Sequence, residues 1–339
     1  MSRSDVGNPF RLIMPPARRP TSSGALDRLT AGTASSPIVV LDSGLGGLTV
    51  VRALQEVLPA ENVVYFGDSA RFPYGAKSAA TVTSYVRQII NYLRPLRPKH
   101  VVIACNTATA LALPALTAAF PDLSISGVIE PGARAAIVAA GARQYPVIGV
   151  LATEATVGSK AYLRAIIRRR HHARVLMQPA PLLAAIIEDG RSDTDPLVRL
   201  ALKQYLTPLL EHEPGVLVLG CTHYPVLKGL IGRMVGPKVQ VIDSAVQCAH
   251  DIARRLQATG LGRNKVSPAR RNASAGSGRE IPARRSFLRC IVTDDPDRFQ
   301  RLAPRFLGEP VGPPRWVSAD ELYGHKPVTT PKVHLRAAI

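Results

Sequence analysis

The stretch His100-Val-Val-Ile-Ala-Cys105-Asn106-Thr107-Ala-Thr109 is an apolar run that ends in a cysteine and small polar residues. A second stretch, Gly215-Val-Leu-Val-Leu-Gly-Cys221-Thr222-His223-Tyr-Pro225, repeats this order. Short apolar runs of this kind are typical of buried strands, and the residues after them of a turn into a helix. We therefore expect Cys105 and Cys221 to follow the carboxyl ends of two strands.

Two further apolar runs end in the same way. Ile38-Val-Val-Leu-Asp-Ser-Gly44 precedes the first cysteine stretch, and Val147-Ile-Gly-Val-Leu-Ala-Thr153 precedes the second, so the chain looks pseudo-duplicated. In open α/β sheets, ligands bind outside the carboxyl ends of the strands. All four strand ends are therefore expected to meet at one cleft between two domains, with the cysteines on opposite sides of a ligand.

Apolar runs alternate with amphipathic segments along the chain, a pattern that favours parallel strands joined by helices. The predicted strands are residues 38–41, 62–66, 100–104, 147–151, 174–178, 216–219 and 239–242. The predicted helices are residues 48–57, 79–93, 159–170 and 196–211. The charge-free residues 101–120 include Asn106 and Pro114, which favour a buried strand, a turn and a helix over a membrane span. The predicted fold class is α/β, with two pseudo-symmetric doubly wound domains and mostly parallel sheets.

Composition limits the functional classes. A chain of 339 residues can hold two domains with cores of their own. Four cysteines without a Cys-x-x-Cys pair fit a reducing compartment, and residues 1–36 contain no continuous apolar segment like that of a signal peptide. We expect a cytoplasmic protein that has no membrane partner.

The net charge of +19 raises the question of a nucleic-acid partner. Residues 254–289 hold ten Lys or Arg and one acid, and most of the remaining excess lies in residues 1–37 and 322–339. These segments are rich in Ser, Gly and Pro, which is typical of solvated linkers. Nucleic acid is therefore not the expected partner, although binding of nucleic acid or an acidic protein by the basic segments stays an alternative function.

Two opposed thiols suit one kind of chemistry. Inverting a carbon acid requires a base that removes a proton from one face and an acid that delivers one to the other. Cysteine can serve as either, because its ordinary pKa is near 8.5 and a cation or helix N-terminus lowers it. Asn106, Thr107, Thr222 and the first amides of each following helix can bind carboxylate oxygens, and Asp42 can bind an ammonium group or assist the proton transfer.

Five motifs in this order resemble glutamate racemase, the cofactor-independent enzyme that supplies D-glutamate for bacterial cell-wall synthesis. The resemblance covers residues 38–245. The motifs are Leu41-Asp42-Ser43-Gly44-Leu-Gly-Gly-Leu, Tyr65-Phe-Gly-Asp68-Ser-Ala-Arg-Phe-Pro73-Tyr74-Gly75, Ala104-Cys105-Asn106-Thr107-Ala-Thr, Gly220-Cys221-Thr222-His223-Tyr-Pro and Val241-Ile-Asp243-Ser.

The resemblance implies that Cys105 is the base for D-glutamate and Cys221 the base for L-glutamate, each acting as the acid in reverse. Asp42, His223 and Glu188 would assist, with Glu188 orienting the Cys221 side. The implied substrate-binding residues are Asp42, Ser43, Tyr74, Gly75, Asn106, Thr107, Thr222 and His223, with Thr153 and Thr156 as further lining residues. No cofactor is implied, L- and D-glutamate are the small-molecule partners, and the protein would be a homodimer. Aspartate or another acidic amino acid stays the alternative substrate.

The resemblance also implies that the chain crosses between domains. The first α/β domain would comprise residues 37–130 and 243–321, and the second residues 131–242. Residues 1–36 would be a flexible basic extension, 262–285 a basic low-complexity insertion and 322–339 a flexible tail.

Several residues allow a second interpretation. Cys248 and Cys290 are expected to be inert buried side chains. Cys221 and His223 could be two zinc ligands, but no further cluster has the usual spacing, so no metal site is expected. The run Gly44-Leu-Gly46-Gly47-Leu-Thr49 resembles a dinucleotide-binding turn, but Thr49 replaces its third glycine. Asp68 and Asp243 could be either helix caps or site residues.

Overall fold

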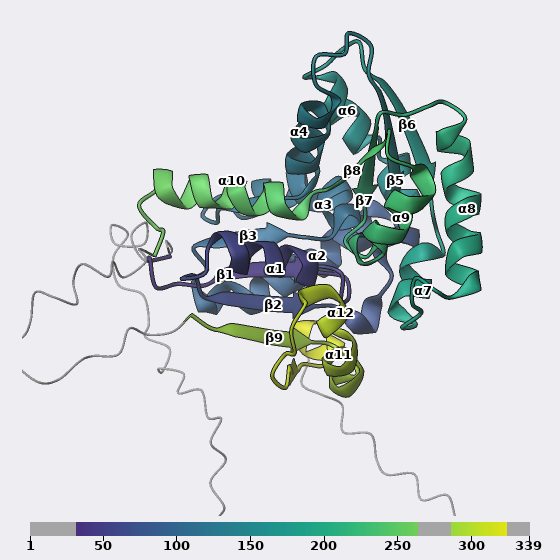
Figure 1. The fold of residues 1–339 in the computed structure, drawn as a ribbon. Coiled ribbons are helices and arrows are strands. Elements are labelled where there is room, and N and C mark those ends of the chain that lie inside the picture. The colour runs from purple at the N-terminus through teal and green to yellow at the C-terminus, as the bar shows by residue number, and fades with distance from the viewer. Residues whose placement is uncertain (1–31, 264–285, 324–339) are drawn as a thin grey trace, which may run out of the picture. The chain divides into compact units, whose positions relative to one another are not determined.

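Two parallel sheets organise the protein in a computed structural model that describes residues 32–263 and 286–323 (Figure 1). The strand order of the first sheet is β10-β9-β2-β1-β3-β4, and that of the second is β6-β5-β7-β8. The first sheet contains β1 (Ile38–Asp42), β2 (Val63–Gly67), β3 (His100–Ile103), β4 (Ile125–Gly127), β9 (Leu288–Val292) and β10 (Arg315–Trp316). The second contains β5 (Val147–Ala152), β6 (Arg174–Pro179), β7 (Val216–Gly220) and β8 (Gln240–Asp243).

The same topology occurs in both sheets. The order β2-β1-β3-β4 matches β6-β5-β7-β8, and every pairing between these strands is parallel. The predicted α/β class with parallel sheets is therefore confirmed. Successive strands lie on opposite sides of β1 and of β5, and such switch points are where open α/β sheets bind ligands. Cys105 and Cys221 follow β3 and β7, the strands beside these two points.

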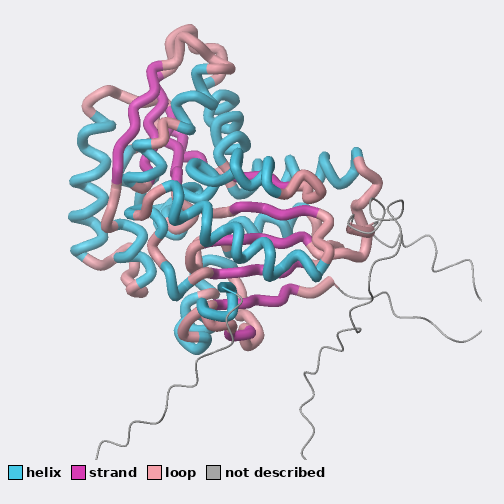
Figure 2. The backbone as a smooth tube through the Cα atoms, turned by 180° about the vertical axis from the view of Figure 1, so that it is seen from behind, coloured by secondary structure: helices cyan, strands magenta, loops and turns pink. Residues whose placement is uncertain are grey.

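Side chains of β1 alternate between two layers of helices. Ile38 and Val40 belong to one hydrophobic cluster, and Val39 and Leu41 to another. The first cluster includes α1 (Leu48–Val57) and α10 (Ala245–Ala258), which lie side by side, and the second includes α2 (Ala79–Leu93) and α3 (Asn106–Ala119). Because successive side chains of a strand point to opposite faces, helices cover both faces of the first sheet (Figure 2).

The second sheet is covered in the same way. Val216 and Val218 cluster with α4 (Ile129–Ala140) and α6 (Ala161–Ile167), whereas Leu217 and Leu219 cluster with α7 (Leu183–Glu188), α8 (Pro196–Leu210) and α9 (Lys228–Val235). The cluster that contains Leu217 and Leu219 also contains Ile38 and Val40 of β1. A continuous hydrophobic core therefore connects the two sheets.

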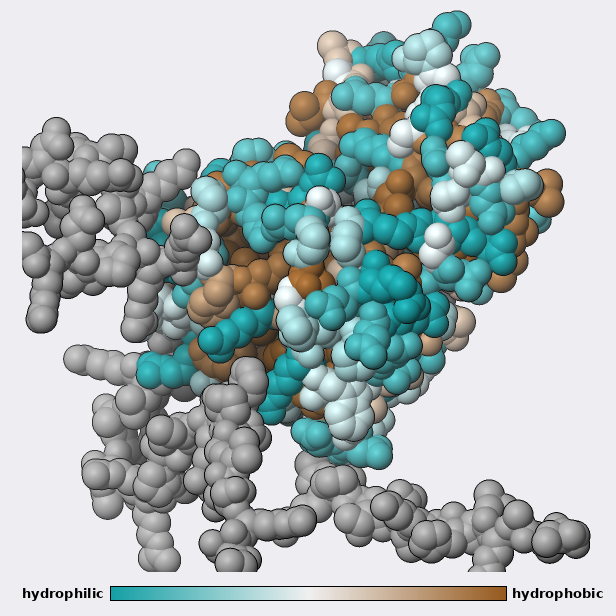
Figure 3. Space-filling view, turned by 60° about the horizontal axis from the view of Figure 1, so that its bottom comes forward, coloured by the Kyte–Doolittle hydropathy of each residue, from teal (hydrophilic) through white to brown (hydrophobic). Residues whose placement is uncertain are grey.

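After β8 the chain returns to the first sheet, where β9 pairs with β2. The short helices α11 (Pro296–Leu302) and α12 (Pro304–Leu307) follow β9, and α12 contacts α1. In the part of the chain that the structure describes, no helix is long and apolar enough to cross a membrane. The face drawn in Figure 3 mixes hydrophilic and hydrophobic residues, without one dominant apolar area.

One predicted helix is shorter than expected. Of residues 159–170, only Ala161–Ile167 are helical, as α6, which follows the separate helix α5 (Glu154–Gly158). Lys160 between the two helices has a φ of 54°, which interrupts the helical backbone. The predicted extension 1–36, insertion 262–285 and tail 322–339 lie almost entirely outside the described residues.

Candidate active site

Cys105 is the N-cap residue of α3, directly after the end of β3. Its Sγ accepts a hydrogen bond from the Ala108 amide over 3.5 Å and donates one to Ser43 Oγ over 3.6 Å. Ser43 follows β1, the neighbour of β3 in the sheet. The first predicted half-site is therefore assembled as expected, with a thiol at a helix N-terminus.

The environment of Cys105 nevertheless favours the neutral thiol. Burial, and then the negative charge of Asp42, raise the pKa of the Cys105 thiol to about 12, against the opposing effect of its hydrogen bonds with Ala108 and Ser43. The helix N-terminus is thus outweighed by burial in the protein without substrate. A cation placed beside Asp42 would remove part of this barrier.

The second half-site is built differently. Cys221 follows β7, but the 3₁₀ turn η5 (Tyr224–Leu227) precedes α9, so the cysteine does not cap an α-helix. Pro225 is the second residue of this turn, a position near a helix start where the missing N–H of proline is tolerated. The expectation that each cysteine is followed directly by helix amides is therefore wrong for Cys221.

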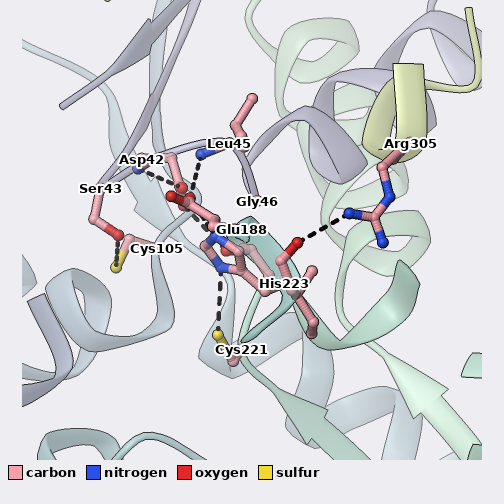
Figure 4. A network of polar contacts seen from close by, with 12 residues as sticks. Asp42, Ser43, Leu45, Gly46, Cys105, Glu188, Cys221, His223 and Arg305 are labelled. Atoms are coloured by element: carbon pink, nitrogen blue, oxygen red, sulfur yellow. Dashed lines mark hydrogen bonds and ion pairs between the residues drawn. The ribbon is translucent and has the colours of Figure 1, made fainter. Parts of the chain in front are cut away.

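His223, instead of a helix N-terminus, lies beside the Cys221 thiol. Cys221 Sγ lies 3.7 Å from His223 Nδ1, and His223 Nε2 lies 2.6 Å from Glu188 Oε1 (Figure 4). Burial alone would lower the pKa of His223, but its hydrogen bonds to Cys221 and Glu188 raise it well above its usual value. The contacts of His223 therefore favour a protonated imidazole beside the second thiol.

Glu188 also contacts the first half-site. Its Oε1 accepts a hydrogen bond from the Leu45 amide over 3.0 Å, in the turn after β1. Thr222, next to Cys221 in the second half-site, donates a hydrogen bond to Asp42 Oδ2 over 3.2 Å. Burial raises the pKa of Asp42, although the positive charge of His223 opposes this. These contacts bring together the predicted assisting residues Asp42, Glu188 and His223.

The glycine-rich turn between β1 and α1 permits this close approach. A Cβ atom at Gly46 would lie 2.4 Å from Thr222 Oγ1 and 2.6 Å from His223 Nδ1, and one at Gly44 would lie 2.2 Å from Glu188 Oε1. The glycines therefore make room for the side chains of the second half-site. This contact gives the turn a role other than binding a dinucleotide.

Asn106 has a free amide group in the site. Its Oδ1 accepts a hydrogen bond from the Tyr162 hydroxyl over 2.8 Å, whereas its Nδ2 is buried and has no partner among the described residues. An unpaired buried donor is unfavourable unless a ligand satisfies it. Asn106 is therefore ready to bind a ligand oxygen.

Three threonine hydroxyls, one from α3 and two from the start of α5, lie next to one another. Thr107 Oγ1 lies 2.8 Å from Thr153 Oγ1 and 3.3 Å from Thr156 Oγ1. A Cβ atom at Gly75 would lie 2.9 Å from the Thr153 Cβ, so this glycine also allows a close approach. Thr107, Gly75 and both threonines at the start of α5 are thus brought together.

Tyr74 is held differently from the other predicted residues. Its hydroxyl donates to Asp68, which also accepts hydrogen bonds from Arg71 Nε at 2.7 Å and Thr293 Oγ1 at 3.0 Å. Burial, and then Asp68, raise the pKa of Tyr74, and a charged Cys105 would raise it further. Asp68 is thus an anchor for the Tyr74 segment and its side chain caps no helix, whereas Asp243 accepts a hydrogen bond from the Ala245 amide at the start of α10.

The two predicted catalytic cysteines lie on either side of the end of β1, because Cys105 Sγ contacts Ser43 and Thr222, the residue after Cys221, donates to Asp42. Cys248 and Cys290 are buried elsewhere in the core, and burial raises the pKa of each to about 12. Across residues 32–263 and 286–323, no group of three or more His, Cys, Asp and Glu side chains is arranged to hold a metal ion.

Sequence reasoning missed several supporting residues. Tyr162 binds Asn106, Asp68 anchors Tyr74, and Arg305 donates to the backbone beside Glu188. Tyr162 and Arg305 lie outside every motif noted in the sequence, whereas Asp68 lies within one and could be either a helix cap or a site residue. No local pattern marks the contacts of Tyr162 and Arg305, because their partners are distant along the chain.

Known proteins share this sequence and fold. Residues 38–251 match the family model described as Asp/Glu/Hydantoin racemase. The chain is 43% identical to the glutamate racemase of Syntrophus aciditrophicus over 272 residues, which is 80% of this chain and 93% of that protein.

Solved structures agree. A glutamate racemase from Francisella tularensis in complex with D-glutamate has a TM-score of 0.73 at 31% identity, covering 85% of this chain and 99% of that one. A glutamate racemase from Thermus thermophilus in complex with β-chloro-D-alanine has a TM-score of 0.69 at 38% identity, covering 86% and 100%. The resemblance predicted from the motifs is confirmed, and the chain belongs to the Asp/Glu/hydantoin racemase family.

Proposed function

We propose that this protein is a glutamate racemase that interconverts L- and D-glutamate by proton transfer between two cysteines, without a cofactor. The observation that carries the proposal is the placement of buried Cys105 and Cys221 after corresponding strands of the two sheets, with Asp42 and Ser43 at the end of β1 contacting both half-sites. The glutamate racemases that match most of this chain support glutamate as the substrate.

Substrate binding uses groups that the site leaves available. The buried Asp42 carboxylate receives the substrate ammonium, and the unpaired Asn106 Nδ2 donates to a carboxylate oxygen. The hydroxyls of Ser43, Thr107 and Thr222 supply further hydrogen bonds. Donors directed at the carboxylate also stabilise the charge that develops on it when the α-proton leaves.

Proton transfer then proceeds in opposite senses for the two enantiomers. With L-glutamate, the Cys221 thiolate removes the α-proton and the Cys105 thiol delivers a proton to the other face. With D-glutamate, Cys105 is the base and Cys221 the acid. The protonated His223 stabilises negative charge at Cys221, and Glu188 holds that imidazole.

Substrate binding favours the thiolate form of Cys105. The Asp42 charge is the second cause of the raised pKa of Cys105, so the ammonium group that neutralises Asp42 also favours the Cys105 thiolate. Binding of D-glutamate thus favours the form of the enzyme in which Cys105 is the thiolate and the proton resides on Cys221.

We propose that the two sheets with their helices act as two domains. The first comprises residues 37–130 and 243–321, the second comprises residues 131–242, and the substrate binds between them.

We also propose that the protein works as a homodimer in the cytoplasm, where its product enters peptidoglycan synthesis. Light scattering of the purified protein tests the dimer, because a monomer mass would contradict it.

Incubation with L-glutamate in D2O tests the activity directly. Deuterium at the α-carbon together with D-glutamate is expected, at a rate well above that with aspartate. Cys105→Ala and Cys221→Ala should each abolish racemisation, and Cys290→Ala is the matched control because this buried thiol lies outside the site. Racemisation that survives in either active-site variant would exclude the two-base mechanism.

A further inference from the structure

The segment after β9 reaches the Cys221 half of the site through two arginines. Arg305 Nη1 donates to the Ile187 carbonyl over 3.0 Å, and its Nη2 donates to the Arg191 carbonyl (Figure 4). Arg298 Nη2 donates to the Glu188 carbonyl over 3.0 Å. Residues of α11 and α12 therefore hold the backbone that carries the Glu188 side chain.

These contacts occur at the end of a helix, where they matter most. Helix α7 ends at Glu188, and its last carbonyls lack the usual amide partner four residues later, although the Ile187 carbonyl also accepts the Gly190 amide at 3.1 Å. A guanidinium group satisfies such carbonyls and is favoured by the negative end of the helix dipole. Gly190 continues the turn with a φ of 86°, a backbone conformation that favours glycine, and a Cβ there would lie 3.5 Å from Leu302 of α11.

Phe306, the residue after Arg305, contacts His223, which is the hydrogen-bond partner of Glu188. The Phe306 ring meets the His223 ring edge-on with centroids 5.6 Å apart, and the Phe72 ring lies 5.4 Å from the same histidine. Successive residues of α12 thus contact the backbone around Glu188 and the imidazole that Glu188 binds. Arg305 itself touches neither a cysteine nor the Glu188 carboxylate in any described contact.

We infer that Arg305, aided by Arg298, is a positioning residue that holds the end of α7 so that Glu188 fixes His223 against Cys221. The half-reaction it serves rests on the proposed racemase function. Loss of the guanidinium would let the Glu188 backbone move relative to Leu45 and His223. Proton transfer at Cys221 would then slow, whereas transfer at Cys105 would be affected much less.

Three variants test this. Arg305→Met removes the donors and keeps an unbranched side chain, and Arg305→Lys keeps one charge that can reach a single carbonyl. Arg301→Met is the matched control, because Arg301 is exposed on α11 and has no hydrogen bond or ion pair with another described residue. We expect kcat/KM to fall roughly 10-fold in Arg305→Met, less in Arg305→Lys and not at all in Arg301→Met.

Isotope effects separate positioning from general damage. Enantiomers have equal free energies, so kcat/KM must change equally in both directions and cannot reveal which cysteine is affected. The primary isotope effect can, since Cys221 removes the α-hydrogen of L-glutamate only. Arg305→Met should raise this effect for α-deuterated L-glutamate and lower or preserve it for the D-enantiomer. An equal change for both enantiomers, or no change in a folded variant, would overturn the inference.

A measurement on His223 distinguishes failure of the inference from failure of the proposed function. The titration of the His223 ring, followed by NMR of ¹⁵N-histidine protein, should move to lower pH in Arg305→Met and stay at the wild-type position in Arg301→Met. If the wild type does not racemise glutamate but this shift occurs, the positioning role stands and the function is wrong. An unchanged titration overturns the positioning role whatever the activity. Arg305→Lys supplies the same readout if Arg305→Met does not fold.

Discussion

The Tyr162 hydroxyl donates a hydrogen bond to Asn106 Oδ1 over 2.8 Å, from a helix of the second sheet to the first residue of α3. Because the amide oxygen is occupied, the amide nitrogen of Asn106 is the group directed at the ligand. Tyr162 is fully buried, and burial raises the pKa of its hydroxyl, so it remains a donor at any physiological pH. A tyrosine outside the motifs thus orients Asn106, a residue within one that we propose binds substrate.

Replacing Tyr162 with Phe should weaken substrate binding. The Asn106 amide would lose its fixed orientation, and one buried hydrogen bond contributes about 1 kcal/mol. We expect kcat/KM for both enantiomers to fall by roughly 5-fold to 10-fold, chiefly through KM. Tyr145→Phe is the control, because Tyr145 is 66% exposed. An unchanged KM in Tyr162→Phe would show that Asn106 does not need this hydrogen bond.

A methyl group at Gly46 should disrupt the site while leaving the rest of the fold in place. The added Cβ would meet the buried Thr222 and His223 side chains, which hydrogen bonds hold in position. We expect Gly46→Ala to lower kcat/KM roughly 100-fold, because a small displacement of the reacting groups strongly lowers the rate of the chemical step.

Gly232→Ala provides the comparison. A Cβ at this position in α9 meets nothing within 4 Å, so the change should raise the free energy of unfolding by about 0.5–1 kcal/mol and leave activity intact. Kinetics and thermal unfolding of both variants measure the two effects. Wild-type activity in Gly46→Ala would contradict the close approach of the two half-sites.

The sheets could be predicted from sequence because buried parallel strands are continuous apolar runs, as in β1 and β7. Strand β4 was missed because Ile125–Gly127 is too short to form a pattern. Helix α4 was missed because its alanines and glycine give little contrast between its faces. The cysteine motifs were visible because each is local, with Cys221 and His223 two positions apart.

The supporting contacts could not be predicted in this way. Tyr162 and Asn106 are 56 positions apart, and Arg305 and Ile187 are 118 apart. Only the folded arrangement of the two sheets brings these residues together. The different surroundings of the two cysteines could not be predicted either, because the two half-sites look alike in sequence. In the structure Cys105 caps α3, whereas η5 lies between Cys221 and α9.

Removing one partner of a buried ion pair should strongly destabilise the protein. Lys99 pairs with Glu61, and its Nζ also donates to the Ala34 carbonyl at 2.8 Å and the Leu261 carbonyl at 2.9 Å. Lys99→Met would leave the Glu61 carboxylate buried without its partner, so we expect a loss of about 3–5 kcal/mol in the free energy of unfolding. Combining Lys99→Met with Glu61→Leu should restore part of this loss. Urea unfolding measures both, and equal losses in the single and double variants would argue against the ion pair as the cause.

Acid should destabilise the protein partly through His100. Its ring is 1% exposed between Ser124 Oγ at 2.8 Å and Ser126 Oγ at 2.7 Å, and burial, with a smaller effect of Arg255, lowers the pKa of His100 to about 4. In the unfolded chain the ring takes up a proton near pH 6.5, whereas in the folded protein it stays neutral until about pH 4. Its contribution to stability is therefore fully present above pH 6.5 and is lost as the pH falls towards 4.

The size of this loss is about 3 kcal/mol if the whole difference in pKa is realised. His100→Gln keeps a side chain that can bond the serines but cannot titrate. The free energy of unfolding of the wild type should fall more steeply than that of the variant between pH 6.5 and 4, and the two curves should run parallel above pH 7. Since the carboxylates and the other histidines are common to both proteins, the difference between the curves isolates His100. Parallel curves over the whole range would mean that the buried ring already accepts a proton near its ordinary pKa.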